Sequence, residues 1–264
     1  MESYKHIELS DDELTLAIIE AKRKKEAILR EQEREVRAQK NRDILTGHKW
    51  GIRQTEPFML WRAANSSLFK GRFVVDETNE LMFKLLVAYF SPADECRDEF
   101  IKIASQMEVE NANYDKGVML AGNFGVGKTW MMQLFQANQR QCFRLRPAKH
   151  IADAFGLAGE ETQDEFIKPF RNPFEDPDVF FQKESGLCID DMGTEDVKNH
   201  YGNKKNVVGD LIEIKYANKT TGVMLHATTN LTTDQLKEFY GLRVVSRMRE
   251  IFNFIELPGC DRRK

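Results

Sequence analysis

The sequence has little that would place the protein in a membrane, in an oxidising compartment or around a zinc ion. Its apolar runs are far shorter than the roughly 20 residues that span a bilayer. The opening stretch MESYKHIELSDDEL is acidic where a secretory signal would be basic and then apolar. The four cysteines lie far apart without a C-x-x-C pair. We therefore expect a cytoplasmic protein with no membrane partner, whose cysteines are small buried apolar residues.

A large excess of positive charge is also missing. The chain carries 39 Lys and Arg against 42 Asp and Glu, a net charge of −3. This balance disfavours a protein that coats nucleic acid through bulk positive charge. Any contact with DNA would have to use a local patch or a larger assembly. The length of 264 residues allows one core with an accessory segment, or two small domains.

The N-terminal segment, residues 1–45, is predicted to be a long charged helix. Ser10 followed by Glu13 is a capping-box pattern, and the next residues contain no glycine or proline. Apolar residues recur at helical spacing on its first half only, so a long coiled coil is not expected. The segment is either a solvated surface helix or a helix whose apolar half docks on a partner.

Residues 46–113 are predicted to form a connector and helices that lead into the core. The connector contains glycines, Pro57 and several aromatic residues, which we expect to pack onto the core, although base stacking is an alternative. Helices are expected at 77–90 and over ECRDEFIKIASQM, because apolar residues recur there at helical spacing. The aromatic residues of the connector are Trp50, Phe58, Trp61 and Phe69.

Residues 114–264 have the pattern of an α/β domain. Short apolar runs alternate with helical stretches, which predicts a mostly parallel sheet with helices on both faces. Residues 158–184 are acidic and contain several prolines, and they are predicted to be a surface insertion. The expected strands are GVMLA (117–121), CFRLR (142–146), GLCIDD (186–191), GVMLHATTN (222–230) and FNFIEL (252–257).

The stretch GNFGVGKTW, directly after the first of these strands, predicts a phosphate-binding loop. It fits G-x-x-x-x-G-K-[ST], in which backbone N–H groups surround a phosphate. In this pattern Lys128 reaches the β- and γ-phosphate oxygens, and the Thr129 hydroxyl binds Mg²⁺. The apolar strand before the loop and the helical pattern after it are the required context. The expected ATP-binding residues are Gly122, Asn123, Phe124, Gly125, Val126, Gly127, Lys128, Thr129 and Trp130.

Polar residues at the ends of two later strands could complete such a site. Asp190 is placed to hold Mg²⁺ through water, and Asp191 to face the γ-phosphate, unless it is only a loop carboxylate. Asn230 suits a group that orients the attacking water, although it also suits the start of a helix. Further on, YGLRVVSRMREIF repeats arginines at 243, 247 and 249. They are either a solvated helical face or are supplied to the nucleotide of a neighbouring subunit.

The order of these motifs, GNFGVGKT, CIDDMG, TTN and YGLRVVSRMRE, resembles the DnaC/IstB-like branch of the AAA+ ATPases, the helicase-loader group, over roughly residues 114–264. The resemblance implies a sheet of order 5-1-4-3-2 and side-by-side assembly with Mg·ATP between neighbours. It also implies individual roles: Walker A at 122–129, the Walker B metal residue Asp190, the catalytic acid Asp191, sensor 1 Asn230, an arginine finger at Arg247 with Arg243 second, and a sensor-2-like Arg263.

The sequence departs from the wider family in two places. Most AAA+ proteins have glutamate at the position of Asp191, so slow hydrolysis is expected. Few residues follow Leu257, so the usual C-terminal helical lid is expected to be missing, as in this branch generally. The N-terminal segment matches no loader domain, so the resemblance does not identify a partner for this protein.

These features favour an ATPase that loads or remodels a replicative hexameric helicase on single-stranded DNA, with the N-terminal helix gripping the helicase. An IstB-like helper of transposition and a nucleotide-gated adaptor with little hydrolysis are the alternatives. A small-molecule phosphotransferase is disfavoured, because residues 158–184 lack the arginine-rich lid that it would need.

Overall fold

The computed structural model describes the chain in two compact units, Met1–His48 and Lys49–Lys264. In the first unit only residues 21–25 are described, and they are helical. The rest of the helix predicted over 1–45, and most of the insertion predicted over 158–184, lie outside the described residues. In the second unit the structure describes residues 49–69, 71–158, 170–171, 184–196, 198–200, 203–217 and 224–262.

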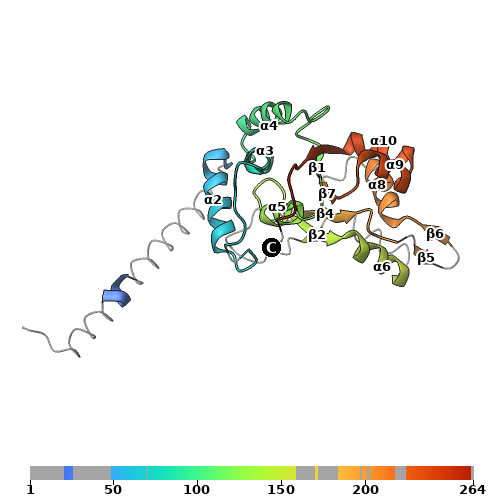
Figure 1. The fold of residues 1–264 in the computed structure, drawn as a ribbon, viewed down its shortest axis with the longest axis horizontal. Helices are drawn as coiled ribbons and strands as arrows, with labels where there is room; N and C mark the ends of the chain where they lie inside the picture. Colours follow the sequence, from blue (N-terminus) through green and yellow to red (C-terminus); the bar gives the residue numbers. More distant parts are fainter. Residues whose placement is uncertain are drawn as a thin grey trace, which may run out of the picture. The chain divides into compact units, whose positions relative to one another are not determined.

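The centre of the second unit is a parallel sheet (Figure 1). Among the described residues, five strands pair in parallel in the order β2-β4-β7-β1-β8. Numbered among themselves in chain order, they run 2-3-4-1-5, which is the predicted order 5-1-4-3-2 seen from the opposite edge. The parallel α/β fold class is therefore confirmed. The strands are β1 (Gly117–Ala121), β2 (Phe143–Pro147), β4 (Glu184–Met192), β7 (Leu225–Thr229) and β8 (Phe252–Glu256).

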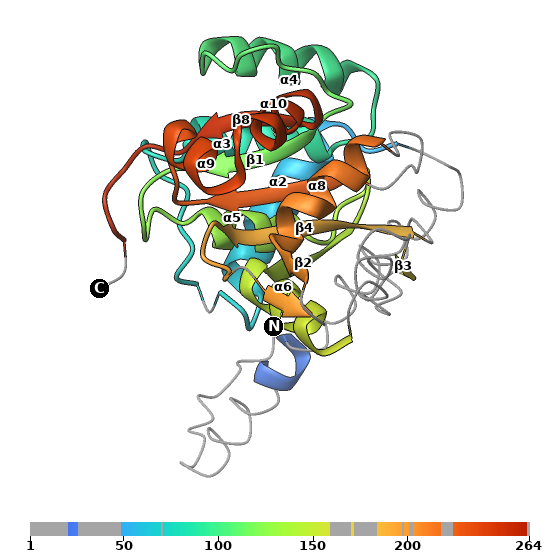
Figure 2. The same cartoon turned by 90° about the vertical axis from the view of Figure 1, so that its right-hand side faces the viewer.

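Helices cover both faces of this sheet (Figures 1 and 2). Along β1, Val118 and Leu120 join one hydrophobic cluster, while Met119 joins the other, because side chains alternate between the faces of a strand. The first cluster contains residues of α2 (Ile52–Asn65), α3 (Glu80–Phe90), α4 (Glu95–Gln106) and α5 (Lys128–Phe135). The second contains residues of α6 (Ala148–Ala158), α8 (Val207–Ala217), α9 (Thr233–Tyr240) and α10 (Leu242–Ile251).

Three short strands lie outside this parallel arrangement. β3 (Phe170–Arg171) pairs antiparallel with β4 at the end where that strand begins. β5 (Lys198–His200) and β6 (Asn203–Lys205) pair with each other in a separate antiparallel ladder. They follow β4 in the chain and precede α8.

Burial was predicted for the aromatic residues of the connector and for the cysteines, and the structure confirms it for only some of them. Trp50 and Phe69 are buried as predicted, with 8% and 0% exposed. Trp61 is 61% exposed, so the prediction is wrong for this residue, whose ring stacks on Phe58 on the outside of α2. The cysteine prediction also fails at one position: Cys96, Cys142 and Cys188 are buried, whereas Cys260 is exposed.

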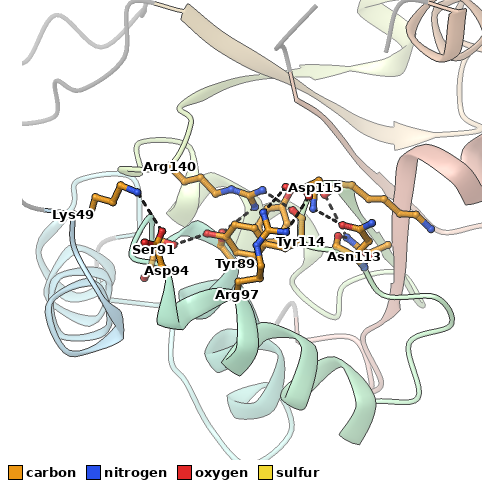
Figure 3. Close-up of polar contacts among 11 residues, drawn as sticks. Lys49, Tyr89, Ser91, Asp94, Arg97, Asn113, Tyr114, Asp115 and Arg140 are labelled. Atoms are coloured by element: carbon orange, nitrogen blue, oxygen red, sulfur yellow. Dashed lines mark hydrogen bonds and ion pairs between the residues drawn. The ribbon is translucent and has the colours of Figure 1, made fainter. Parts of the chain in front are cut away.

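An arginine and two tyrosines join α3 to the segment that leads into β1 (Figure 3). The Arg140 guanidinium lies 3.6 Å from the centroid of the Tyr114 ring and 4.3 Å from that of Tyr89. It also donates to the backbone oxygens of both tyrosines. The Tyr89 hydroxyl donates to the Lys116 oxygen over 2.7 Å. Because Lys116 directly precedes β1, this cluster fixes the strand that carries the phosphate-binding loop.

His226, on β7, is the buried titratable group beside this cluster. Its Nδ1 accepts the Val118 N–H over 3.1 Å, and the rings of Tyr89, Phe90 and Phe143 surround the imidazole. Burial lowers the pKa of His226 from 6.5 to about 3, because desolvation penalises the charged imidazolium and the nearby Arg140 adds repulsion. The folded protein therefore holds this histidine neutral.

We expect this histidine to destabilise the protein in acid. Below pH 6.5 the unfolded chain binds a proton that the folded chain takes up only near pH 3, so the free energy of unfolding falls as the pH is lowered through this window. Between pH 7 and pH 4.5 the contribution is about 2–3 kcal/mol. Urea unfolding at both pH values should show a correspondingly smaller drop for His226→Asn, which retains an acceptor for the Val118 N–H. Equal drops in the two proteins would contradict the assignment.

Candidate functional site

The phosphate-binding loop lies between β1 and α5, at the carboxyl end of a central strand. Its glycines 122, 125 and 127 have φ values of 145°, 73° and 102°, a region that favours glycine. A Cβ on Gly122 would lie 2.5 Å from the Leu257 oxygen, and one on Gly125 would lie 1.8 Å from the Asp261 Oδ1. At Gly122 both the conformation and the packing against backbone require glycine, whereas at Gly125 the positive φ is the requirement, because the exposed Asp261 side chain can move aside.

Lys128, the first residue of α5, lies across the mouth of the loop and is only 5% exposed. Its Nζ donates to the backbone oxygens of Gly122 and Asn123 over 2.8 and 2.7 Å. It also donates to Asn230 Oδ1, at the end of β7, over 2.7 Å. The lysine predicted to reach the phosphates therefore lies within the loop, beside the predicted sensor.

Asp190 and Thr129 lie side by side beneath the loop. The hydroxyls of Thr129 and Thr228 both donate to Asp190 Oδ1, over 2.9 and 2.6 Å. Burial raises the pKa of Asp190, and these two hydrogen bonds oppose the shift. A carboxylate beside a threonine hydroxyl at a phosphate loop is the oxygen donor set that Mg²⁺ uses in P-loop proteins. The residues present therefore fit a magnesium ion, whose charge would favour the ionised carboxylate.

Asp191 is held in an uncommon backbone conformation, with φ of 55°. Its N–H donates to the Thr228 hydroxyl over 2.9 Å, and its carboxylate accepts the Asn230 amide over 3.1 Å. Asn230 thus contacts both Lys128 and Asp191. The neighbouring strands β4 and β7 bring these groups together because their carboxyl ends meet at one edge of the sheet.

A buried pair supports the turn that follows Asp191. The Glu195 carboxylate accepts the Gly193 N–H over 2.8 Å and also the Tyr240 hydroxyl, at the end of α9. Both side chains are largely buried, with Glu195 3% and Tyr240 8% exposed. Tyr240 is followed by Gly241 and then by α10. The turn that presents Asp191 is therefore anchored to the start of the helix that carries Arg243 and Arg247.

These groups open onto a cavity of about 460 Å³. The predicted loop residues from Phe124 to Trp130 line it, together with Asp191 and Asn230. Asp190 lies behind Thr129. Sequence reasoning did not predict two parts of this lining: the wall opposite the loop, formed by residues between 72 and 79, and Arg262. The complete lining is Arg72, Phe73, Val74, Asn79, Phe124, Gly125, Val126, Gly127, Lys128, Thr129, Trp130, Met131, Gln133, Asp191, Asn230 and Arg262.

The predicted arginines do not join this cavity within one chain. Arg243 and Arg247 lie on α10 and pair with Glu213 of α8, at 3.2 and 2.6 Å. The Arg247 guanidinium also lies 5.1 Å from the centroid of the Tyr216 ring. Arg263 lies outside the described residues, whereas its neighbour Arg262 lines the cavity.

No family model and no curated protein matches the sequence. Several solved structures are similar in fold. A Streptococcus pyogenes serotype M3 protein, described as a candidate primosome component, is 18% identical with a TM-score of 0.40, over 65% of this chain and 84% of that one. The DnaC helicase loader is 16% identical, with a TM-score of 0.39, over 63% and 92%. AMPPCP-bound DnaA from Aquifex aeolicus is 16% identical, with a TM-score of 0.41, over 70% and 48%.

Likeness at this level concerns the course of the chain rather than its chemistry. Within the described parts of the chain, no helix is both long enough and apolar enough to cross a membrane.

Proposed function

We propose that the chain is a cytoplasmic AAA+ protein that binds and hydrolyses ATP and acts on a replicative hexameric helicase on single-stranded DNA. One observation carries the nucleotide part of this proposal: a lysine, a threonine, two carboxylates and an amide converge at the mouth of a glycine loop. They come from β4, from α5 and from the residue that directly follows β7. This is the constellation that positions a triphosphate and an attacking water.

Each of these groups has a separate task in hydrolysis. Backbone N–H groups of the loop and the Lys128 ammonium bind the β- and γ-phosphates. Thr129 and Asp190 would hold Mg²⁺, which neutralises charge on the phosphate oxygens. Asp191 accepts a proton from the attacking water. At the same time the water oxygen bonds to the γ-phosphorus, and the bond between the γ-phosphorus and the bridging oxygen of ATP breaks. Asn230 orients that water and Asp191 together, since it already contacts the carboxylate.

The chemistry needs a further positive charge, which we propose comes from a neighbouring subunit. Arg247, with Arg243 as the second candidate, lies on α10 and pairs with Glu213 instead of lining the cavity of its own chain. An arginine supplied between subunits would neutralise charge in the transition state. Hydrolysis would then depend on self-association, and the short Asp191 side chain would keep it slow.

The helicase part of the proposal assigns residues 1–45 to docking on the partner. Its support is the motif order of the ATPase domain together with a charged N-terminal segment that forms a unit separate from that domain. The near-neutral net charge fits a protein that meets DNA as part of an assembly better than one that coats it.

Affinity capture with purified candidate partners tests this function. The full chain, a chain lacking residues 1–45 and the Lys128→Ala variant are each immobilised and offered a hexameric replicative helicase or a transposase, with and without ATP. We expect the full chain to retain the helicase in the presence of ATP, and the shortened chain to lose it. Retention of the transposase, or of no helicase under any nucleotide condition, would contradict the loader role and favour a transposition helper or an adaptor.

A further inference from the structure

A short strap, residues 257–262, runs from β8 along the outside of the phosphate-binding loop. The Leu257 N–H donates to the Ala121 oxygen over 2.8 Å, and the Arg262 N–H donates to the Gly125 oxygen over 3.0 Å. Between these bonds, the Asp261 carboxylate occupies the space where a side chain on Gly125 would lie. The strap therefore contacts the loop at its beginning and at its middle.

The side chain of Arg262 continues beyond the loop to the opposite wall of the cavity. Its Nη2 donates to the Asp76 carboxylate over 2.5 Å and also to the Thr78 hydroxyl. The pKa of Asp76 is lowered to about 2, first by the hydrogen bond from Thr78 and then by that from Arg262. Asp76 is thus ionised at neutral pH and holds the guanidinium.

The opposite wall, residues 72–79, is held together by the side chain of Asn79, which is only 2% exposed. Its amide donates to the Val74 oxygen over 3.0 Å, and its Oδ1 accepts the Asp76 N–H over 2.9 Å. Arg72, Phe73 and Val74 line the cavity on this side. Any shift of Asp76 would therefore move residues that face the cavity.

We propose that Arg262 is a positioning residue of the nucleotide site, because its backbone holds the phosphate-binding loop while its side chain holds the 72–79 wall. This tie adds to a direct contact between the two walls, in which the Arg72 guanidinium lies 5.6 Å from the centroid of the Trp130 ring. This inference rests on the proposed nucleotide function and deepens it. It differs from a sensor role: a residue that spaces the walls affects ATP and ADP alike, whereas a residue that contacts the γ-phosphate affects ATP alone.

Titration of Arg262→Ala with fluorescent ATP and ADP tests the inference. We expect both dissociation constants to rise by on the order of 10-fold, the effect typical of losing a group that orients binding residues. The turnover number should stay within about 2-fold, since the loss is shared by the ground and transition states. Arg97→Ala is the control, because Arg97 also pairs with an aspartate, Asp115, but in a more exposed pair away from the cavity. It should leave both constants unchanged.

A charge exchange separates positioning from direct contact. Asp76→Arg alone should weaken both nucleotides, because two cations then repel across the cavity. Adding Arg262→Asp should recover most of the loss, since the tie is restored with its charges reversed. Circular dichroism melting confirms that each variant folds.

Three outcomes would overturn the inference: unchanged affinity in Arg262→Ala, loss of ATP binding alone, or no recovery in a folded double variant. A wild-type chain that binds neither nucleotide would instead show that the proposed function has failed, and this inference with it. If the wild type binds both and Arg262→Ala does too, the proposed function stands and only the positioning role is lost.

Discussion

Lys128→Ala is expected to weaken ATP binding by about 100-fold, or about 2.8 kcal/mol. The ammonium of Lys128 is held among three oxygens at the mouth of the loop, at 2.7 to 2.8 Å. It would exchange some of these bonds for charge-assisted bonds to phosphate, each worth about 1.5–3 kcal/mol. Alanine removes that charge and also releases Asn230. Isothermal titration calorimetry with Mg·ATP measures the change.

A matched control for this substitution is available on α4. Lys102 is 64% exposed and pairs only weakly with Glu99 one turn away, so Lys102→Ala removes the same charge far from the cavity. Its affinity for ATP should equal that of the wild type. If Lys128→Ala bound ATP within 3-fold of the wild type, the loop would not be the phosphate site.

Asp191→Asn is expected to separate binding from hydrolysis. Phosphate release should fall by about 10²–10⁴-fold, because an amide cannot accept the proton of the attacking water. ATP affinity should change by only a few fold, since asparagine has the same size and tolerates the positive φ of this position. The amide oxygen can still accept the bond from Asn230. Malachite-green phosphate assays and calorimetry on the same preparation measure both quantities.

Asp234→Asn is the corresponding control. Asp234 lies exposed in the first turn of α9 and pairs with Lys237. Both the affinity and the turnover of this variant should match the wild type. Hydrolysis that survived in Asp191→Asn at more than about a tenth of the normal rate would show that another group accepts the proton.

The fold could be predicted from the sequence because its signals are local. Each central strand is a short apolar run next to a glycine or a polar residue, and each helix has its own apolar spacing. Lys128, Asp190, Asp191 and Asn230 come directly at the ends of such strands or after the loop. The rule that parallel strands share a carboxyl edge was enough to place them together, and the structure does so.

The second wall of the cavity could not be predicted because its position is set by tertiary packing. Residues 72–79 lie far from the loop in sequence, and no local pattern marks Asp76 or Asn79 as neighbours of a phosphate site. The strap gave a partial signal: the run GCDRR pointed to Arg263, which lies outside the described residues, and its neighbour Arg262 lines the cavity. Burial was predicted wrongly at Trp61 and Cys260 for the same reason, because tertiary packing leaves these apolar side chains on the surface.

We propose above all that Thr129 and Asp190 hold a divalent metal while the glycine loop binds a triphosphate. A crystal structure of the chain with Mn²⁺ and a non-hydrolysable ATP analogue tests it most directly. We expect an anomalous peak beside the Thr129 hydroxyl and the Asp190 carboxylate, with the phosphates against residues 125–129. An analogue bound elsewhere, or a metal peak away from these two side chains, would contradict it.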